Sequence, residues 1–225
     1  MTAFRDGHAL GAQAERLGAS GEPWPSGGLP RGRPAPVVVA AYTAVGAVAI
    51  GASLALGRNP IACDAWIGAR GAASWVLSVG LGLLLGATTI AATRIMVRRT
   101  GWARELYFAL RPAVQGESGG TLLVVAVASG TGEELFFRGL LVPFVGVIAS
   151  SILFGALHQI RGRARWGWMA WATLMGLLFA SVFTTTGSLA GPLIAHAAIN
   201  HANLRFLRDT HPAPRRRPLG GLLRR

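Results

Sequence analysis

The sequence has no lysine and a single cysteine, and charged residues of any kind make up only 14% of its 225 residues. Soluble domains carry about 25% charged residues. Because Cys63 is the only cysteine, an intrachain disulfide and a cysteine-based metal cluster are both excluded. All 22 basic residues are arginine, which together with abundant alanine and glycine indicates a GC-rich genome.

The scarcity of charge leaves long apolar runs. A soluble helical bundle would place charges at every helical turn, whereas uncharged segments of about 20 residues are typical of membrane-spanning helices. The sequence therefore predicts an all-α fold, a polytopic transmembrane helical bundle with about six spans. The fourth span is shorter than the others, and a bend is expected at Pro143 before it. The expected spans are Pro36–Leu56, Ala72–Ala92, Thr121–Val142, Phe144–Ile160, Trp166–Thr184 and Ser188–Leu204.

The distribution of arginine predicts the orientation of these spans. Most arginines fall in the two tails, the second loop and the fourth loop, and only Arg58 and Arg70 lie in loops on the opposite side. Because cytoplasmic loops carry the excess of basic residues, both termini are expected to be cytoplasmic. We expect location in a bacterial inner or plasma membrane. The net charge of +13 then reflects topology and anionic lipid at the basic cytoplasmic loops, with no nucleic-acid partner.

The chain divides into four parts. Residues 1–34, rich in glycine, proline and arginine, are expected to form a disordered basic tail, and no signal peptide is expected because the first apolar run starts only near Pro36. Residues 35–120 are expected to hold two non-catalytic spans and a cytoplasmic connector with an amphipathic helix over 103–110. Residues 121–207 hold the remaining spans, and residues 208–225 form a second basic tail.

Two adjacent glutamates and an arginine interrupt the third span. Ionisable residues at that depth are costly and indicate a functional site. Glu134 and Arg138 are four residues apart, so they share a helix face and are expected to pair. Glu133 points about 100° away and has no partner in its own helix, as suits a general base. The structural alternative, in which both acids only hold the bundle together through Arg138, stays open.

Further polar residues fall in the later spans. His158 ends the fourth span, and His196 and Asn200 share a face of the sixth because they are four residues apart. Taken singly, each has an ordinary interpretation, since a histidine at a helix end is often interfacial and asparagine often joins helices. Two neighbours could replace them in this pairing, and their roles stay open: His201 and Asn203.

Taken in order, the segments 133–141, 150–158 and 188–196 with Asn200 resemble the CPBP family of intramembrane proteases. This family, also called Abi, includes the eukaryotic CAAX prenyl endopeptidases and bacterial bacteriocin-processing and immunity proteins. The resemblance covers roughly Leu122 to Asn203. The third segment is the least similar, because Ala190 stands where many members carry a bulkier residue.

The resemblance implies an endopeptidase that cleaves a membrane-associated peptide or protein. It implies that Glu133 and His158 activate the attacking water, and that His196 and Asn200 stabilise the oxyanion. Residues 121–207 would then be the catalytic core. The resemblance assigns the orientation and neutralisation of the site to two supporting residues: Glu134 and Arg138.

Three alternatives remain. Histidines and glutamates could instead hold zinc or another divalent metal, although the His-Glu-x-x-His signature is absent and the resemblance favours glutamate-dependent hydrolysis without a cofactor. The chain could also be a catalytically inactive immunity or scaffold protein of the same fold. A transporter is disfavoured by the lack of an inverted repeat.

Overall fold

The computed structural model describes residues 34–68 and 70–210, and most of both predicted tails lies outside these ranges. Within them the regular elements are helical, which confirms the predicted all-α bundle. The only pairing of β type in this part of the chain is one isolated bridge between Ala62 and Ser188. The helices are α2 (Ala35–Ala55), α3 (Gly71–Arg99), α4 (Gly101–Leu110), η1 (Arg111–Ala113), α5 (Gly119–Glu134), the π-helix η2 (Leu135–Leu141), α6 (Val142–Leu157), α7 (Ala164–Thr186) and α8 (Ala190–Asp209).

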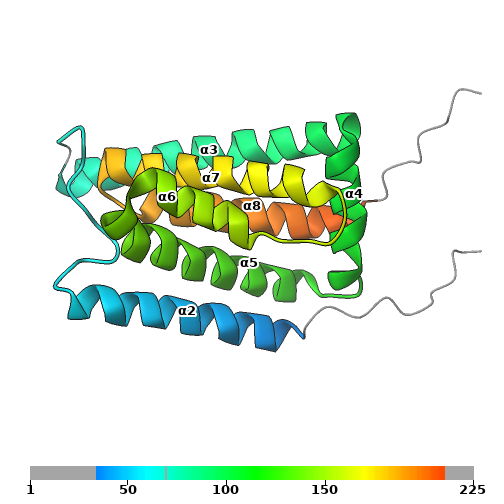
Figure 1. Ribbon diagram of the computed structural model, residues 1–225, viewed down its shortest axis with the longest axis horizontal. Coiled ribbons are helices and arrows are strands. Elements are labelled where there is room, and N and C mark those ends of the chain that lie inside the picture. The colour runs from blue at the N-terminus through cyan, green and yellow to red at the C-terminus, as the bar shows by residue number, and fades with distance from the viewer. Residues whose placement is uncertain (1–33, 69, 211–225) are drawn as a thin grey trace, which may run out of the picture. The chain divides into compact units, whose positions relative to one another are not determined.

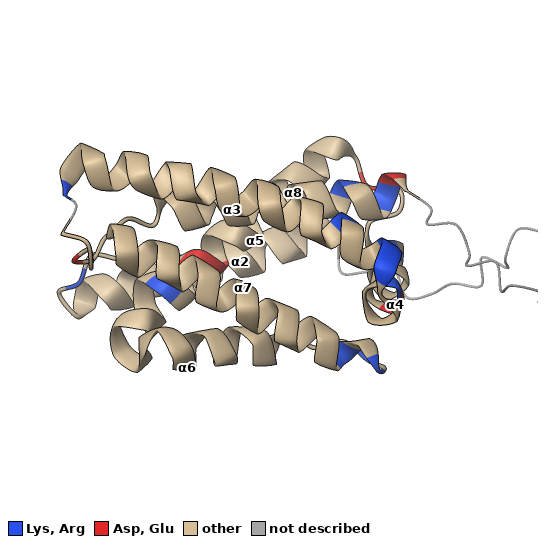
Figure 2. Ribbon diagram, turned by 90° about the horizontal axis from the view of Figure 1, so that it is seen from above, with Lys and Arg blue, Asp and Glu red and all other residues tan. Residues whose placement is uncertain are grey.

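Among the described residues, α8 packs between α3 and α5, α2 packs on α5, and α6 packs on α7 (Figure 1). The helix α4 lies across one end of this bundle, where an amphipathic helix is expected from the sequence. The helix α2 begins, and α8 ends, at that same end (Figure 1). Charged segments gather there too, while a few charges lie inside the bundle (Figure 2). The two ends of the described chain thus lie on one side, as the predicted even number of crossings requires.

Four helical segments are long and apolar enough to cross a membrane: Ala35–Ala55, Gly71–Arg99, Gly119–Leu157 and Ala164–Thr186. The third of them contains two of the six predicted spans. The sixth predicted span corresponds to α8, which is less apolar because it carries four histidine and asparagine residues. The order of six helical segments therefore agrees with the sequence, although the fourth is short and α8 is less apolar than the other predicted spans.

The reversal between the third and fourth spans occurs at Gly146, three residues after the expected bend at Pro143. Gly146 has φ 79°, a left-handed conformation that favours glycine. The chain then folds back on η2, since the Ser150 hydroxyl donates to the Phe137 carbonyl at 3.1 Å. The returning part, residues 147–157, is only about 16 Å long at 1.5 Å per residue. It is shorter than a full span, and residues 158–163 carry the chain on to the start of α7.

Small side chains form the contact between α3 and α8. A Cβ atom at Gly191 would overlap the carbonyl group of Ser78, so the two backbones touch directly. The Ser78 hydroxyl donates to the Ser188 carbonyl at 2.8 Å and accepts from the Gly191 amide at 2.9 Å. Close packing through small residues is typical of helices in membranes. In the first half of α3, small buried residues recur at every fourth position: Ser74, Ser78, Gly82 and Gly86.

Candidate active site

The acidic pair lies at the end of α5, and the arginine lies in η2. The carboxylate of Glu134 and the guanidinium of Arg138 are almost completely buried and form an ion pair of 3.0 Å. A second guanidinium nitrogen of Arg138 donates to the Gly176 carbonyl on α7 at 3.1 Å. The guanidinium also stacks near the rings of Phe154 and Phe179, at 4.6 and 5.2 Å. Arg138 thus joins three helices and carries the counter-charge of Glu134.

The π-helix at 135–141 is a feature that the sequence does not reveal. A π-helix is rare, and it is found frequently at functional sites. It starts directly after Glu134 and includes Arg138, so the wider turn falls between the acids and the reversal at Gly146. No residue type in this segment marks the change from the α-helical to the π-helical pattern.

His196 from α8 contacts both glutamates. Its Nδ1 lies 2.7 Å from Glu134 Oε1, and its Nε2 lies 3.7 Å from Glu133 Oε2. The imidazole is buried and stacks on the Phe179 ring, with centroids 4.9 Å apart and an angle of 17° between the planes. The hydrogen bond to Glu134 is not anticipated by the sequence, because the pattern pairs His196 with Asn200 on its own helix.

His158 follows the last residue of α6. Its Nδ1 lies 2.7 Å from the Phe154 carbonyl oxygen, which can only accept, so Nδ1 carries the hydrogen. Its Nε2 is directed to Glu133 Oε2 at 3.9 Å. The rings of Phe154 and Trp168 hold the imidazole on two sides, at 4.4 and 5.4 Å between centroids. The returning part of α6 therefore places His158 beside Glu133, which lies in α5.

The three atoms that converge here are Glu133 Oε2, His158 Nε2 and His196 Nε2. Glu133 Oε2 is buried and accepts no hydrogen bond from the described residues. Glu134 Oε1 accepts from the Arg138 guanidinium at 3.0 Å, and the same oxygen lies 2.7 Å from His196 Nδ1. Distances of 3.7 and 3.9 Å are too long for direct hydrogen bonds. They are suited to one water molecule bridging the carboxylate and an imidazole.

Asn200 lies one helical turn beyond His196 on α8. Its amide nitrogen donates to the Ser129 hydroxyl at 3.0 Å, one turn before Glu133 on α5. Asn203 is turned away from the glutamates, since its amide oxygen accepts from Arg94 on α3 at 2.8 Å. His201 has a buried Nδ1 without a hydrogen-bond partner among the described residues.

A cavity of about 520 Å³ opens onto the Glu133 carboxylate. Its walls come from α2, α4, α5, η2, the end of α6, the loop after it and α7, and they are mainly apolar apart from a few polar groups. The polar lining residues are Tyr42, Glu133, His158 and Gln159. No group of three or more His, Cys, Asp or Glu side chains in the described part of the chain is arranged to hold a metal ion.

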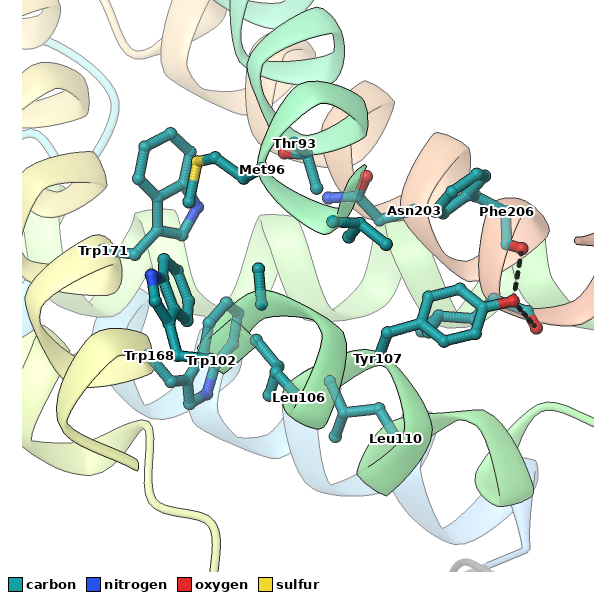
Figure 3. Close-up of a pocket in the computed structure, with 13 residues that line it drawn as sticks. Thr93, Met96, Trp102, Leu106, Tyr107, Leu110, Trp168, Trp171, Asn203 and Phe206 are labelled. Atoms are coloured by element: carbon teal, nitrogen blue, oxygen red, sulfur yellow. Dashed lines mark hydrogen bonds between the residues drawn. The ribbon is translucent and has the colours of Figure 1, made fainter. Parts of the chain in front are cut away.

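A smaller cavity of about 90 Å³ lies under α4, on the other side of Trp168 and Leu110. Aromatic side chains from α4, α7 and α8 surround it, with Asn203 at its edge (Figure 3). The Tyr107 hydroxyl beside it lies against the carbonyls of Phe206 and Leu207, at 3.4 and 3.3 Å (Figure 3). This cavity contains no acidic residue or histidine, so it offers no general base.

Part of the chain matches a family of known proteins. Residues 117–202 match the model of the family described as "Type II CAAX prenyl endopeptidase Rce1-like". The chain is also 34% identical over 68 residues to the "Uncharacterized protein YpbD" of Bacillus subtilis (strain 168), a match that spans 30% of this chain and 35% of that relative. No solved structure matches at a significant level.

The matched region contains all six candidate residues, and the resemblance found in the sequence is confirmed at the level of the family. With the apolar helices, it indicates an integral membrane protein with an intramembrane protease fold. The segment 117–202 thus resembles the Rce1-like type II CAAX prenyl endopeptidases.

Proposed function

We propose that the protein is an intramembrane endopeptidase in which Glu133 is the general base. The observation that carries the proposal is the buried Glu133 Oε2, which accepts no hydrogen bond from the described residues and lies within 4 Å of two imidazoles from other segments. An idle scaffold would have little physical reason to leave a buried carboxylate oxygen unpaired, because such a group costs free energy.

In the proposed reaction a water molecule binds between Glu133 and His158. Glu133 takes one proton from the water as its oxygen attacks the carbonyl carbon of the peptide bond. The carbon–nitrogen bond then breaks, and the proton passes from Glu133 to the leaving amine nitrogen. The products are a new carboxyl terminus and a new amino terminus, and the carboxylate of Glu133 is restored.

The negative oxygen of the tetrahedral intermediate needs donors. His196 can supply one from Nε2 when that nitrogen carries a hydrogen. The amide of Asn200 supplies a second if it turns from the Ser129 hydroxyl toward the substrate. Arg138 balances the charge of Glu134, so that Glu134 can hold His196 in place without competing for the proton of the water.

The substrate of this reaction is a membrane-associated peptide or protein. The mainly apolar walls of the 520 Å³ cavity favour an apolar segment over a hydrated one. Chemistry of this kind at a carboxylate requires no metal. A zinc-dependent variant of the same site, in which Glu133 and the two histidines would be ligands, predicts loss of activity on chelation.

The experiment uses protein reconstituted in lipid vesicles and a fluorescence-quenched CAAX peptide, with and without a farnesyl group. Glu133→Gln and His158→Ala are compared with wild type and with Glu105→Gln, a matched control at an exposed position on α4. We expect cleavage by wild type and the control, loss of cleavage in both site variants, and no effect of a chelator.

Unchanged cleavage by Glu133→Gln would rule out Glu133 as the general base. Inhibition by chelator that zinc reverses would favour the metal site. No cleavage of either peptide by wild type would contradict the proposal.

A further inference from the structure

One polar group in the catalytic cavity comes from outside the matched segment. Tyr42 lies on α2, and it lines the cavity together with Glu133 and His158. The position of α2 is fixed by close packing on α5, because a Cβ atom at Gly132 would overlap the Tyr42 carbonyl. Gly132 precedes Glu133 directly, so the contact holds Tyr42 beside the acidic residue.

The half-buried Tyr42 phenol lies in the same cavity lining as the Glu133 carboxylate, with which it interacts electrostatically. The other polar groups facing this carboxylate are His158 and His196, on the side of Oε2, and Arg138, which is paired with Glu134. Tyr42 therefore differs from them, since a neutral phenol always carries a hydrogen to donate and adds no charge.

We propose that Tyr42 is a positioning residue for Glu133. Its hydroxyl donates to Oε1 and so turns the free Oε2 toward the two imidazoles. A carboxylate on a three-bond side chain rotates readily, and a general base must be held close to the proton that it removes. This inference rests on the proposed function of Glu133. It also gives the first span a part in the chemistry, where the sequence predicts only a non-catalytic helix.

The kinetic test is Tyr42→Phe, which removes the hydroxyl and keeps the ring. Tyr107→Phe is the matched control, because the Tyr107 hydroxyl lies outside the catalytic cavity and contacts carbonyl groups at the end of α8, including that of Thr210. We expect Tyr42→Phe to lower kcat about tenfold with KM within about twofold, and the control to behave like wild type. A kcat equal to that of wild type in Tyr42→Phe overturns the proposal. A change confined to KM also overturns it, because Tyr42 would then bind substrate rather than position the base.

A second measurement needs no cleavage. The chain has two tyrosines, so labelling with ¹³Cζ-tyrosine gives two resonances, which the two Tyr→Phe variants assign. We expect Glu133→Leu, which removes the acceptor, to shift the resonance of Tyr42 and to leave that of Tyr107 in place. If wild type cleaves no peptide, the proposed function fails and this shift alone decides whether the contact exists. An unchanged Tyr42 resonance overturns the inference even if the enzyme is active.

Discussion

Two polar clusters lie between the helices, and they differ in how completely their groups are paired. The site cluster contains Glu133, Glu134, Arg138, His158 and His196. The α4 cluster contains Arg94, Tyr107 and Asn203. Both contain an arginine stacked on aromatic rings, since Arg94 lies 3.9 Å from the centroid of Phe206 much as Arg138 lies over Phe154.

In the α4 cluster the polar groups have partners. Arg94 donates to Asn203 Oδ1 at 2.8 Å and to the Ala202 carbonyl at 2.7 Å, and the Tyr107 hydroxyl has carbonyl acceptors. In the site cluster, one oxygen of Glu133 and one of Glu134 are buried without a hydrogen bond from the described residues. Native proteins satisfy nearly all buried polar groups, so such exceptions indicate function. The extent of hydrogen bonding, rather than burial alone, therefore separates the site cluster from the structural α4 cluster.

The largest effect on stability is expected from removing the two arginines in turn. Arg138→Met leaves the Glu134 charge buried without a partner, which should lower the free energy of unfolding by about 3–5 kcal/mol. Arg94→Met loses two hydrogen bonds but exposes no buried charge, and should cost about 2 kcal/mol. Denaturant unfolding in detergent measures both. The double variant Glu134→Gln/Arg138→Met is the control and should recover most of the loss. Equal losses for the two arginines would contradict the distinction between the clusters.

A smaller effect, on rate, is expected at Asn200. If its amide leaves Ser129 to stabilise the oxyanion, Asn200→Ala should lower kcat by about 10²-fold. Ser129→Ala removes only the resting hydrogen bond and should change kcat within roughly threefold. The pair of rates in vesicles decides the role of Asn200. Similar small changes in both variants would assign it to helix packing and leave the oxyanion to His196.

The smallest effect is expected at Asn203, in the α4 cluster. Asn203→Leu removes an acceptor of Arg94 and should lower the free energy of unfolding by about 1 kcal/mol, with kcat/KM within about twofold of wild type. Unfolding and cleavage are measured on the same preparation. A large loss of cleavage without a matching loss of stability would place this cluster in the catalytic machinery.

The sequence is informative where the pattern is local. The apolar runs predict the long helices, and the spacing of Glu134 and Arg138 predicts an ion pair within one helix, which the structure contains. That Glu133 needs a partner from another helix also follows from its direction on the helix. The order of the motifs identifies the family.

The remaining features depend on how helices rotate and pack, which periodicity does not encode. The reversal lies at Gly146 rather than Pro143, because a left-handed residue, and not the proline, ends the helix. The hydrogen bond from His196 to Glu134 and the approach of Tyr42 to Glu133 join distant segments. Such contacts depend on the distances between helices. Those distances are set by the close packing of small residues, which the sequence pattern does not reveal.

We propose that the two adjacent glutamates have different tasks, chemistry for Glu133 and charge pairing for Glu134. The most direct test is the cleavage rate of Glu133→Gln in vesicles, with its unfolding midpoint measured beside that of Glu134→Gln. We predict that Glu133→Gln lowers kcat by about 10³-fold or more while its midpoint is equal to or above that of wild type. Glu134→Gln should lower the midpoint, because Arg138 loses its counter-charge. Cleavage by Glu133→Gln at the rate of wild type would contradict the account.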